Sequence, residues 1–578
     1  MSTSPARDVQ VIPIAAQTRL LRSRTWDRLK FEIEYALQKG TTANSYLIEG
    51  DRVALIDPPG TSFTEIFLPV LQERIDPKTI DYLILGHLNP NRSRTLGRLL
   101  ELNPHLTVVC SNPAARSLPK LLPETQVNTL VIKSGEQTLD LGQGHQLRFI
   151  LTPSPRWSDH LCTYDPQTQI LFTDKLFGAH VCGDQVFDEG WQVYQEDRRY
   201  YFDCLMAPHA SQVTTALEKL AAYSVQFYAP GHGPLVRYGR QELTESYQAW
   251  LTAQQNSSAQ VALIYASAYG NTAIVAQAIA RGITKAGVGV TAINCEFAEP
   301  EELQAALQGA AGFIMGSPTL GGHAPTQIQT ALGVVLAQTN PKDQLAAVFG
   351  SYGWSGEAID MLEQKFRDAG YRFGFDPVRV KFKPTDEIVK YCEEAGTDFA
   401  QALKRQQKRR QSQSTKGSVS ESQSARTEQA VGRVVGSLCV VTTTKGDLNS
   451  AMLASWVSQA SFNPPGFTVA VAKERAIESL LYEGNAFVLN ILPDGSPLQR
   501  KFTKNYAPGE DRFTGIATEI ADNGCPILTD GLAYLECAVT KRMECGDHWL
   551  VYASAKKGQV LDDNNVTAVH HRKTGSHY

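Results

Sequence analysis

The sequence lacks the features of several large protein classes. Its ten cysteines form no Cys-x-x-Cys pair, so neither a zinc ribbon nor an iron–sulfur motif is indicated. No run of about 18 apolar residues occurs, and the first residues lack the apolar core of a signal peptide. A formal net charge of −4 gives no electrostatic case for nucleic acid or an anionic membrane. We therefore expect a cytoplasmic protein with reduced, mostly buried thiols, no nucleic-acid binding and no membrane insertion.

The length points to several domains joined by a linker. A chain of 578 residues is too long for one hydrophobic core, and the usual ~100 to 200 residues per domain predicts three or four domains. The stretch 404–430 begins Lys-Arg-Gln-Gln-Lys-Arg-Arg and continues as a Ser- and Gln-rich run with almost no apolar residues. We predict that this stretch is a linker between folded domains.

The central region carries the most informative motif. A buried strand is predicted at 261–265, and the loop Ala266-Ser-Ala-Tyr-Gly-Asn-Thr272 follows it at the start of a helix. Gly270 permits a backbone that a side chain would obstruct, and Ser267 and Thr272 offer short hydrogen-bonding groups. The unpaired amides at a helix N-terminus attract anions. The motif therefore predicts a phosphate site.

Two further loops follow predicted strands in the same region, Gly316-Ser-Pro-Thr-Leu-Gly-Gly322 and Phe349-Gly-Ser-Tyr-Gly-Trp-Ser-Gly356. In an open parallel sheet, ligands bind outside the carboxyl ends of the strands, so the three loops predict one cleft. A single such turn would more often be an ordinary connection between a strand and a helix. Three in order resemble flavodoxin over about residues 259–403. The resemblance implies a doubly wound α/β domain that binds FMN.

The resemblance to flavodoxin also implies which residues contact FMN. They lie in the three loops, where aromatic side chains would flank the flat ring of the cofactor. The implied FMN-binding residues are Ser267, Ala268, Tyr269, Gly270, Asn271, Thr272, Pro318, Thr319, Leu320, Gly321, Ser351, Tyr352, Gly353, Trp354 and Ser355.

Short strands alternate with turns and helices between about residues 31 and 255, which predicts a domain of layered helices and sheets. Four of its turns carry polar residues. They are Gly86-His-Leu-Asn-Pro-Asn-Arg92, Thr152-Pro-Ser-Pro-Arg-Trp157, Leu171-Phe-Thr-Asp-Lys-Leu-Phe-Gly178 and Ala229-Pro-Gly-His-Gly-Pro234. Together these turns resemble the metallo-β-lactamase-like domain, an αβ/βα sandwich. The predicted strands are 45–49, 52–57, 82–86, 107–110, 146–152 and 170–173.

Because this domain stands directly before the flavodoxin-like one, the pair resembles a flavodiiron protein, a family that reduces oxygen or nitric oxide at two irons. In that family the four polar turns supply the iron ligands. The corresponding places hold His87, Asn89, Asn91, Arg92, Arg156, Lys175 and His232. Of these seven residues, only the two histidines match the family's ligands.

The replacements change the charge of the pocket. Three carboxylates become Asn89, Asn91 and Lys175, and two imidazoles become Arg92 and Arg156, so the formal charge moves from −3 to +3. Guanidinium has no lone pair for a metal, and a lysine would first have to lose its proton. Like charges about 4 Å apart repel by roughly 4 kcal/mol at an effective dielectric constant near 20. We therefore predict no di-iron centre and no metal, and expect an anion, such as chloride, to suit the pocket better.

Two other interpretations of nearby residues stay open. His87 and His232 with Asp174 would be a candidate site for a single metal, although Asp174 lies one residue out of register. Three ligands are the smallest set usual for a catalytic metal. His145 and His160 are expected to be ordinary surface or strand-end histidines.

Residues 431–578 carry a third set of signals after the linker. A strand is predicted at 432–443, and Leu453-Ala-Ser-Trp456 and Ser461-Phe-Asn-Pro-Pro465 follow it. This order resembles the short-chain flavin reductase family, which implies a split β-barrel and a second flavin, FMN or FAD. The implied flavin contacts are Ala454, Ser455, Trp456 and Ser461, while Leu453 stands where family members offer a hydroxyl to the flavin phosphate. A plain β-barrel interaction module is the alternative.

Two polar residues near the end of this region have two interpretations. Asp547 and His548 either contact the flavin or the pyridine nucleotide, or they stabilise a turn. The sequence does not distinguish these roles.

The order of the three domains resembles the flavodiiron proteins of oxygenic phototrophs, and within them the variants with substituted iron ligands. The resemblance implies electron transfer from NAD(P)H through the second flavin and FMN to oxygen, which is reduced to water. It also implies a homodimer, or a hetero-oligomer with a metal-competent paralogue, because the FMN of one subunit faces the metal pocket of another. Our leading hypothesis is that this chain carries electrons as the metal-poor subunit of such a hetero-oligomer.

Three other functions remain to be compared with this hypothesis. A stand-alone NAD(P)H:flavin reductase or oxidase would produce mainly peroxide. A non-catalytic regulatory subunit would hold a structural flavin and sense an anion. A β-lactamase-like hydrolase would need a zinc-bound water, and the ligand replacements that argue against iron also remove the ligands for that zinc.

Overall fold

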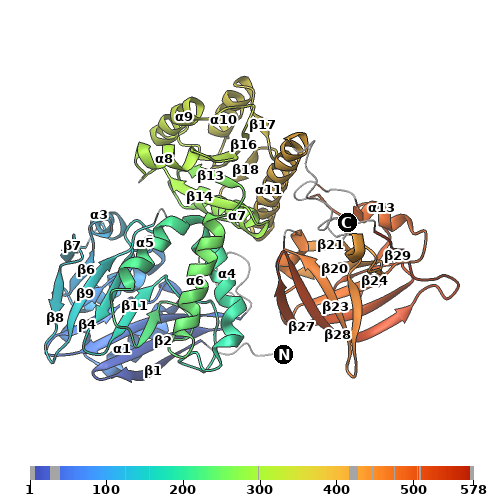
Figure 1. The fold of residues 1–578 in the computed structure, drawn as a ribbon. Helices are drawn as coiled ribbons and strands as arrows, with labels where there is room; N and C mark the ends of the chain where they lie inside the picture. The colour runs from blue at the N-terminus through green and yellow to red at the C-terminus, as the bar shows by residue number, and fades with distance from the viewer. Residues whose placement is uncertain are drawn as a thin grey trace. The chain divides into compact units, whose positions relative to one another are not determined.

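The computed structural model of the chain divides into two compact units, one of residues 1–258, 262–266 and 289–308, the other of 259–261, 267–288 and 309–578. Three sets of sheets follow one another along the sequence, coloured from blue to red in Figure 1. The described residues are 7–26, 39–123, 125–154, 156–296, 298–414, 427, 429–445, 448–473, 475–503, 506 and 510–572.

The N-terminal domain is built on two sheets. One has seven strands in the order β1-β2-β3-β4-β5-β6-β7, and the other has five in the order β12-β11-β10-β9-β8. The strands are β1 Asp8–Ala15, β2 Thr18–Thr25, β3 Thr41–Glu49, β4 Val53–Ile56, β5 Ile80–Ile84, β6 Thr107–Ser111, β7 Asn128–Ile132, β8 Thr138–Asp140, β9 Gln146–Leu151, β10 Leu161–Asp165, β11 Ile170–Asp174 and β12 Phe227–Pro230.

Alternation along the strands gives this domain three buried layers. Leu47 on β3 packs toward one side of the seven-stranded sheet with helices, whereas Ile48 packs between the two sheets. Neighbouring residues of a strand point to opposite faces, so nearly continuous apolar strands are expected in a sheet covered on both sides. The helices are α1 Thr64–Arg74, α2 Ser93–Leu102 and α3 Asn112–Leu121 over the seven-stranded sheet, and α4 Gln195–Leu205, α5 Ala210–Leu220 and α6 Arg240–Gln255 over the other.

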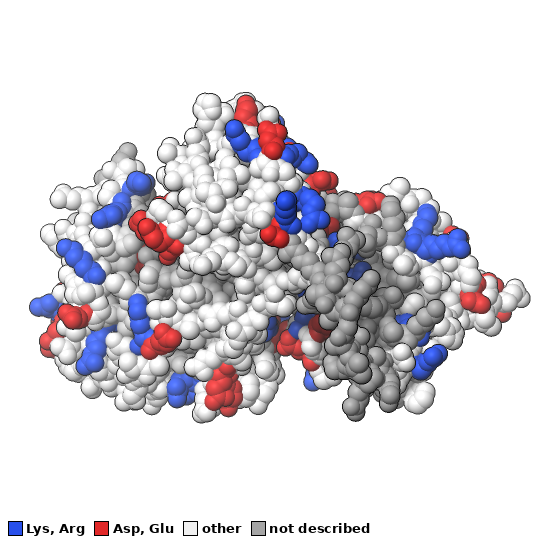
Figure 2. All heavy atoms as spheres, turned by 45° about the horizontal axis from the view of Figure 1, so that its top comes forward, with Lys and Arg blue, Asp and Glu red and all other residues white. Residues whose placement is uncertain are grey.

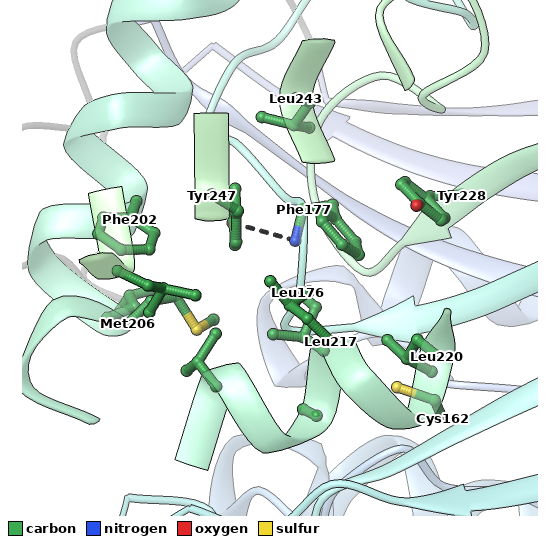
Figure 3. Packing of buried hydrophobic residues seen from close by; sticks show 14 of the residues in the cluster. Cys162, Leu176, Phe177, Phe202, Met206, Leu217, Leu220, Tyr228, Leu243 and Tyr247 are labelled. Atoms are coloured by element: carbon green, nitrogen blue, oxygen red, sulfur yellow. Dashed lines mark hydrogen bonds between the residues drawn. The ribbon is translucent and has the colours of Figure 1, made fainter. Parts of the chain in front are cut away.

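Aliphatic and aromatic side chains join α4, α5 and α6 to the five-stranded sheet, as Figure 3 shows. The ring of Phe177 stacks on Tyr228 with centroids 4.1 Å apart. The hydroxyl of Tyr247 accepts a hydrogen bond from the backbone N–H of Phe177 at 3.1 Å. This bond satisfies an amide in the turn that also carries Lys175, so the core of the domain fixes one side of the predicted pocket.

The six predicted strands of this domain correspond to β3, β4, β5, β6, β9 and β11, whereas β7, β8, β10 and β12 were not predicted. Two further strands come before all of these. β1 and β2 pair antiparallel, and β2 pairs with β3 from Thr18↔Ile48 to Thr25↔Thr41. The sheet thus begins at Asp8, ahead of residue 31, where the sequence led us to start the domain. Residue 31 itself lies outside the described residues. The sequence did not predict this hairpin because charged residues such as Arg22 and Arg24 interrupt its apolar pattern. In the structure the side chains of these two arginines are buried.

The central domain is a doubly wound sheet of the predicted kind. Its strand order is β14-β13-β15-β16-β17, with β18 pairing with β16, so the order reverses beside β13. Such a reversal leaves a crevice at the carboxyl ends of the strands. The elements are β13 Gln260–Tyr265, α7 Asn271–Lys285, β14 Gly289–Asn294, α8 Pro300–Leu307, β15 Gly312–Pro318, α9 Thr326–Gln338, β16 Leu345–Tyr352, α10 Glu357–Asp368, β17 Arg372–Phe373, β18 Val378–Lys381 and α11 Asp386–Ser414.

Helix α11 extends into the stretch predicted as linker. It continues from the folded domain to Ser414, so the first residues of 404–430 are helical. Residues 415–426 and 428 lie outside the described part of the chain. The linker prediction for that part stays untested.

The C-terminal domain is an antiparallel β structure. Its main sheet has the order β21-β20-β24-β27-β28-β23-β22. The cluster of Val441, Val471 and Leu489 forms its core. Its elements are β19 Gly436–Ser437, β20 Cys439–Lys445, β21 Leu448–Ala454, β22 Val457–Phe462, β23 Pro465–Ala472, η7 Ala476–Leu480, β24 Ala486–Ile491, α13 Pro497–Thr503, β25 Thr518–Ile520, β26 Pro526–Leu528, β27 Ala533–Cys545, β28 His548–Val560 and β29 Val569–His570.

The surface and the cysteines agree with the expectations from composition. On the face drawn in Figure 2, acidic and basic side chains are interspersed. Within the described ranges, no helix combines the length and apolar character needed to cross a membrane. All ten cysteines lie in the described part of the chain and are free thiols, and most are buried.

Two glycines in the central domain make a matched pair for a stability test. A Cβ on Gly282 of α7 would lie 1.9 Å from the backbone oxygen of Glu393 on α11, whereas Gly333 of α9 has nothing within 4 Å. We expect Gly282→Ala to lower the free energy of unfolding by about 1–3 kcal/mol because two helices are forced apart. Gly333→Ala should raise it by about 0.5–1 kcal/mol. Urea unfolding measures both changes, and equal effects would contradict the close helix packing.

Candidate functional site

A small cavity in the N-terminal domain collects most of the residues predicted for the altered metal pocket. Its volume is about 20 Å³, which suits roughly one water molecule. Six of the seven predicted residues, all except Arg156, line this cavity together with residues 57–60 after β4. The lining residues are Ala43, Asn44, Asp57, Pro58, Pro59, Gly60, His87, Asn89, Asn91, Arg92, Lys175, Gly231 and His232.

The ends of four strands bring these side chains together. Asp57 follows β4, His87 follows β5, Asp174 ends β11 and His232 follows β12. Asp57 and Asp174 have left-handed backbones, with φ of 53° and 44°. Such a conformation costs about 1–3 kcal/mol in a residue other than glycine and tends to occur where a side chain must be aimed at a site. Here it accompanies two buried carboxylates.

His87 and Asp174 form the closest ion pair of the pocket. The ring Nδ1 of His87 lies 2.5 Å from Asp174 Oδ2, and both residues are buried. Burial lowers the pKa of His87 to about 3. Burial alone would raise the pKa of Asp174, but His87, Lys175 and Arg92 hold it well below its usual value. His87 is therefore neutral, donates its Nδ1 proton to the Asp174 carboxylate, and has at Nε2 a lone pair without a hydrogen-bond partner among the described residues.

Arg92 forms the second ion pair. Its Nη1 donates to Asp57 Oδ1 at 2.7 Å and to the backbone oxygen of His87 at 3.1 Å. Asp57 also accepts the backbone N–H of Gly86 at 2.9 Å. Burial and the neighbouring Asp174 raise the pKa of Asp57 to about 6, although Arg92 lowers it. The Arg92 guanidinium thus forms ion pairs with the carboxylates of Asp57 and Asp174.

Lys175 occupies the opposite side of the cavity beside His232. Its Nζ lies 3.4 Å from His232 Nε2, and the His232 Nδ1 donates to the backbone oxygen of Thr42 at 2.6 Å. That second bond fixes the tautomer of His232, so Nε2 faces the lysine as an acceptor. An ammonium group here takes the place of a metal ion as the partner of that imidazole.

The structure does not place all the predicted pocket residues together. Asn89 accepts the backbone N–H of Asn91 at 2.9 Å, and both line the cavity. Arg156 does not line it, and its guanidinium lies 4.9 Å from the ring centre of Trp157. With Asp57 and Asp174 beside Arg92 and Lys175, the formal charge of the buried cluster is near zero and not the +3 expected from the sequence.

Of the two carboxylates, Asp174 was a candidate metal ligand from the sequence, whereas Asp57 was missed. Asp57 ends a predicted strand before a Pro-Pro-Gly turn, and neither carboxylate replaces a family ligand. His160 and His145 are buried and not on the surface. They hydrogen-bond to Thr152 at 2.7 Å and Asp165 at 2.9 Å, which are structural roles.

These residues do not suit two irons. A di-iron centre needs several carboxylate and imidazole ligands, whereas the cavity offers two imidazole nitrogens, amides, a guanidinium, an ammonium and one carboxylate, that of Asp57, which already accepts a hydrogen bond from Arg92. Arginine cannot ligate a metal, and amides are weak ligands for iron. Within the described ranges, no group of three or more His, Cys, Asp or Glu residues has a metal-binding arrangement. The donor chemistry therefore argues against both the di-iron and the single-metal interpretation.

The three predicted flavin loops lie together at the carboxyl edge of the central sheet. Thr272 in the first loop and Ser351 in the third share a hydrogen bond of 2.8 Å. The backbone N–H of Thr319 in the second loop donates to the backbone oxygen of Ser351 at 2.9 Å. Gly270 has φ of +81° immediately before α7, which a residue with a Cβ would rarely adopt. The arrangement suits a phosphate at the start of α7.

Exposed rings border these loops. Tyr269 and Trp354 are 85% and 90% exposed, and Leu320 is 39% exposed. Exposed apolar side chains that gather beside one another often mark a ligand or partner site, whereas single ones need no explanation. Within the first loop, the Ser267 hydroxyl accepts the backbone N–H of Ala273 at 3.0 Å. Ser267 thus caps the helix, which leaves the remaining loop amides for the cofactor.

The predicted flavin residues of the C-terminal domain lie at the end of β21 and in the next hairpin. Ser455 is buried with a hydroxyl that has no hydrogen-bond partner among the described residues. The ring of Trp456 lies 4.9 Å from that of His548, whose Nδ1 bonds to Asp547 at 2.8 Å. Ser461 lies in the β22–β23 hairpin opposite Gly466. These groups are compatible with a flavin contact, and the role of Asp547 and His548 stays a prediction.

Family models match all three domains. They are an ODP family beta lactamase over residues 41–233, a flavodoxin over 263–396 and a flavin reductase like domain over 431–576. The fold and the loops therefore define a flavoprotein with three domains, metallo-β-lactamase-like, flavodoxin-like and flavin reductase-like, in the predicted order.

Similar proteins extend over the whole chain. The chain is 66% identical over 579 residues to putative diflavin flavoprotein A 3 of Synechocystis sp. (strain ATCC 27184 / PCC 6803 / Kazusa), covering 100% of this chain and 96% of the relative. It is 63% identical over 580 residues to putative diflavin flavoprotein A 6 of Nostoc sp. (strain PCC 7120 / SAG 25.82 / UTEX 2576), covering 100% of both.

One solved structure is also similar, the metal-soaked Flv1 flavodiiron core from Synechocystis sp. PCC6803. It has 67% sequence identity and a TM-score of 0.68, and the match covers 70% of this chain and 100% of that chain. The chain belongs to the flavodiiron family, in its diflavin flavoprotein A group. Members are oxidoreductases that typically reduce oxygen with electrons carried by flavin, so the predicted family, fold and enzyme class are confirmed.

Removing one partner of a buried ion pair in the pocket tests how much that ion pair contributes to the stability of the domain. We expect Arg92→Leu to lower the free energy of unfolding by about 3–5 kcal/mol because Asp57 is left as a buried charge without its cation. Adding Asp57→Asn should recover much of this loss, since the uncompensated charge is then gone. Urea unfolding of the two variants measures the difference. Equal stability of the single and double variants would contradict the pairing.

Proposed function

We propose that this chain carries electrons from NAD(P)H through a second flavin, FMN or FAD, and FMN toward oxygen. In this proposal it is the metal-poor subunit of a hetero-oligomer in which a metal-competent paralogue reduces oxygen to water. The observation that carries the proposal is the contrast between two sites. The three loops of the central domain suit FMN, whereas the altered metal pocket contains Arg92 in buried ion pairs and Lys175 beside the imidazole of His232.

The chain's own residues supply binding and orientation for this route. The backbone amides at the start of α7 would hold the phosphate, and Thr272 and Ser351 join two of the loops by a hydrogen bond. The exposed rings of Tyr269 and Trp354 would cover the flavin and limit the access of water. FMN, when bound, accepts and releases one or two electrons, which suits it to a position between a hydride donor and one-electron acceptors.

The altered pocket has a different part in this proposal. It keeps the N-terminal domain folded as a scaffold for assembly and holds a water molecule or a small anion beside Lys175, as the volume of about 20 Å³ permits. The neutral His87 has a lone pair and no proton at Nε2, so it accepts a hydrogen bond from a water molecule more readily than it holds an anion. A cytoplasmic location completes the proposal.

The first test is the content of metal and flavin in one purified sample. We expect flavin at one to two per chain and iron and zinc far below one per chain, because the donor set does not suit a metal. Plasma mass spectrometry measures the metals, and release followed by chromatography measures the flavin. Iron near two per chain would overturn the metal-poor assignment, and this chain would then be an oxygen reductase in its own right.

The second test uses the chain together with a metal-competent paralogue. We expect the pair to reduce oxygen to water and to lose this activity when the paralogue's iron ligands are mutated. Thr272→Val in this chain should weaken FMN binding about tenfold, because a hydrogen bond near a charged phosphate is lost, and should lower oxygen consumption in step with FMN content.

Three outcomes would contradict the hetero-oligomer. Water production that survives mutation of the paralogue's iron ligands would exclude electron delivery to those irons. Peroxide as the main product of this chain alone would favour a stand-alone oxidase. Failure of NAD(P)H to bleach the flavin without oxygen would favour a regulatory subunit.

A further inference from the structure

Phe382 is an unusual residue outside the three flavin loops. It follows β18 and has φ of +58°, a left-handed backbone that is an outlier for a bulky side chain. Its ring is 54% exposed. An asparagine or a glycine would adopt this backbone more readily. The backbone of Phe382 is therefore strained, and its half-exposed ring gains little free energy from burial to offset that strain.

The backbone of Phe382 is held by its neighbouring strand. β18 pairs in parallel with β16, up to Tyr352↔Lys381, and the N–H of Phe382 donates to the backbone oxygen of Tyr352 at 2.8 Å. The loop that follows β16 is the third flavin loop. The carboxyl ends of parallel strands meet at one edge of a sheet, so this pairing places Phe382 at the same edge as that loop.

The ring of Phe382 contacts that loop through Trp354. The two ring centres lie 6.1 Å apart at an interplanar angle of 77°, an edge-to-face arrangement. Such pairs are favourable because the positive edge of one ring meets the negative face of the other. A Cβ on Gly353 would lie 3.5 Å from Cε1 of Phe382, so the ring also lies against the backbone of the loop. Phe382 is thus an aromatic neighbour of Trp354, whose side chain stays 90% exposed with this contact in place.

We propose that Phe382 is a positioning residue for the FMN site, and that its left-handed backbone aims the ring at Trp354 so that the indole stands ready to cover the flavin. Strain is kept at functional sites where a side chain must be aimed precisely. Prior orientation of a binding residue lowers the entropy lost when a ligand binds. Phe382 contacts Trp354, and Trp354 would in turn contact the cofactor when it is bound.

This inference rests on the proposed FMN site, so its test includes measurements on the protein without cofactor. The variants are Phe382→Gly, which removes the ring and relieves the backbone, and Phe382→Tyr, which keeps an aromatic ring. Phe373→Ala is the matched control because β17 pairs with Leu345 and Ala346, at the opposite end of β16 from the flavin loops. Each variant is made in the full chain and compared with Trp354→Phe.

We expect Phe382→Gly to be at least as stable as the natural protein in urea unfolding without cofactor, because backbone strain is relieved. Its near-ultraviolet circular dichroism should lose the signal that Trp354→Phe also loses. It should bind FMN about three- to tenfold more weakly, the change expected from one aromatic pair. The reduction potential of the bound flavin should also shift. Phe382→Tyr should restore all of these, and Phe373→Ala should leave the dichroism signal and FMN affinity unchanged.

Two results would overturn the proposal. A Phe382→Gly variant that is clearly less stable would show that the ring is structural. Unchanged dichroism, FMN affinity and potential in that variant would show that Trp354 is not positioned by it. If the natural protein binds no FMN, the proposed function fails, while the dichroism of the protein without cofactor still tests the contact between Phe382 and Trp354.

Discussion

A carboxylate cannot stay buried without a partner, and this constraint shapes the N-terminal domain. Asp57 and Asp174 sit at strand ends with strained backbones, and Arg92 and His87 satisfy them. In a metal-binding member of the family, a multivalent ion would neutralise such a cluster. In this chain, cationic and neutral side chains perform the same electrostatic task. The fold is therefore preserved although the chemistry of the pocket differs.

The sequence predicted most of what depends on local patterns. The order of the domains, the strands with apolar runs and the three flavin loops follow from strand signals and small-residue turns, and the structure joins the loops as expected through Thr272 and Ser351. These features are readable because backbone conformation and short-range hydrogen bonds determine them. The same patterns missed the β1–β2 hairpin, where long-range pairing overrides a charged sequence.

Other structural features depend on the direction in which a single side chain points, and the sequence could not predict them. Asp174 is out of register with the family's ligand, yet its left-handed backbone turns the carboxylate onto His87. Arg156 occupies a ligand position in sequence but packs on Trp157 and leaves the cavity. Phe382 belongs to no motif. For Asp174 and Phe382 a tertiary contact between distant segments accompanies the direction of the side chain, and sequence spacing carries no record of such a contact.

The ion pairs of the pocket also restrict how this chain can change over evolutionary time. Returning Arg92 to a histidine would strand Asp57 beside an uncharged neighbour, and replacing Lys175 by a carboxylate would set a new negative charge near Asp174. Each single reversion loses stability, of the order of a few kcal/mol, before any metal can bind to compensate. Fitting a metal to this pocket would therefore require several coordinated substitutions, because each ion pair must be replaced as a unit.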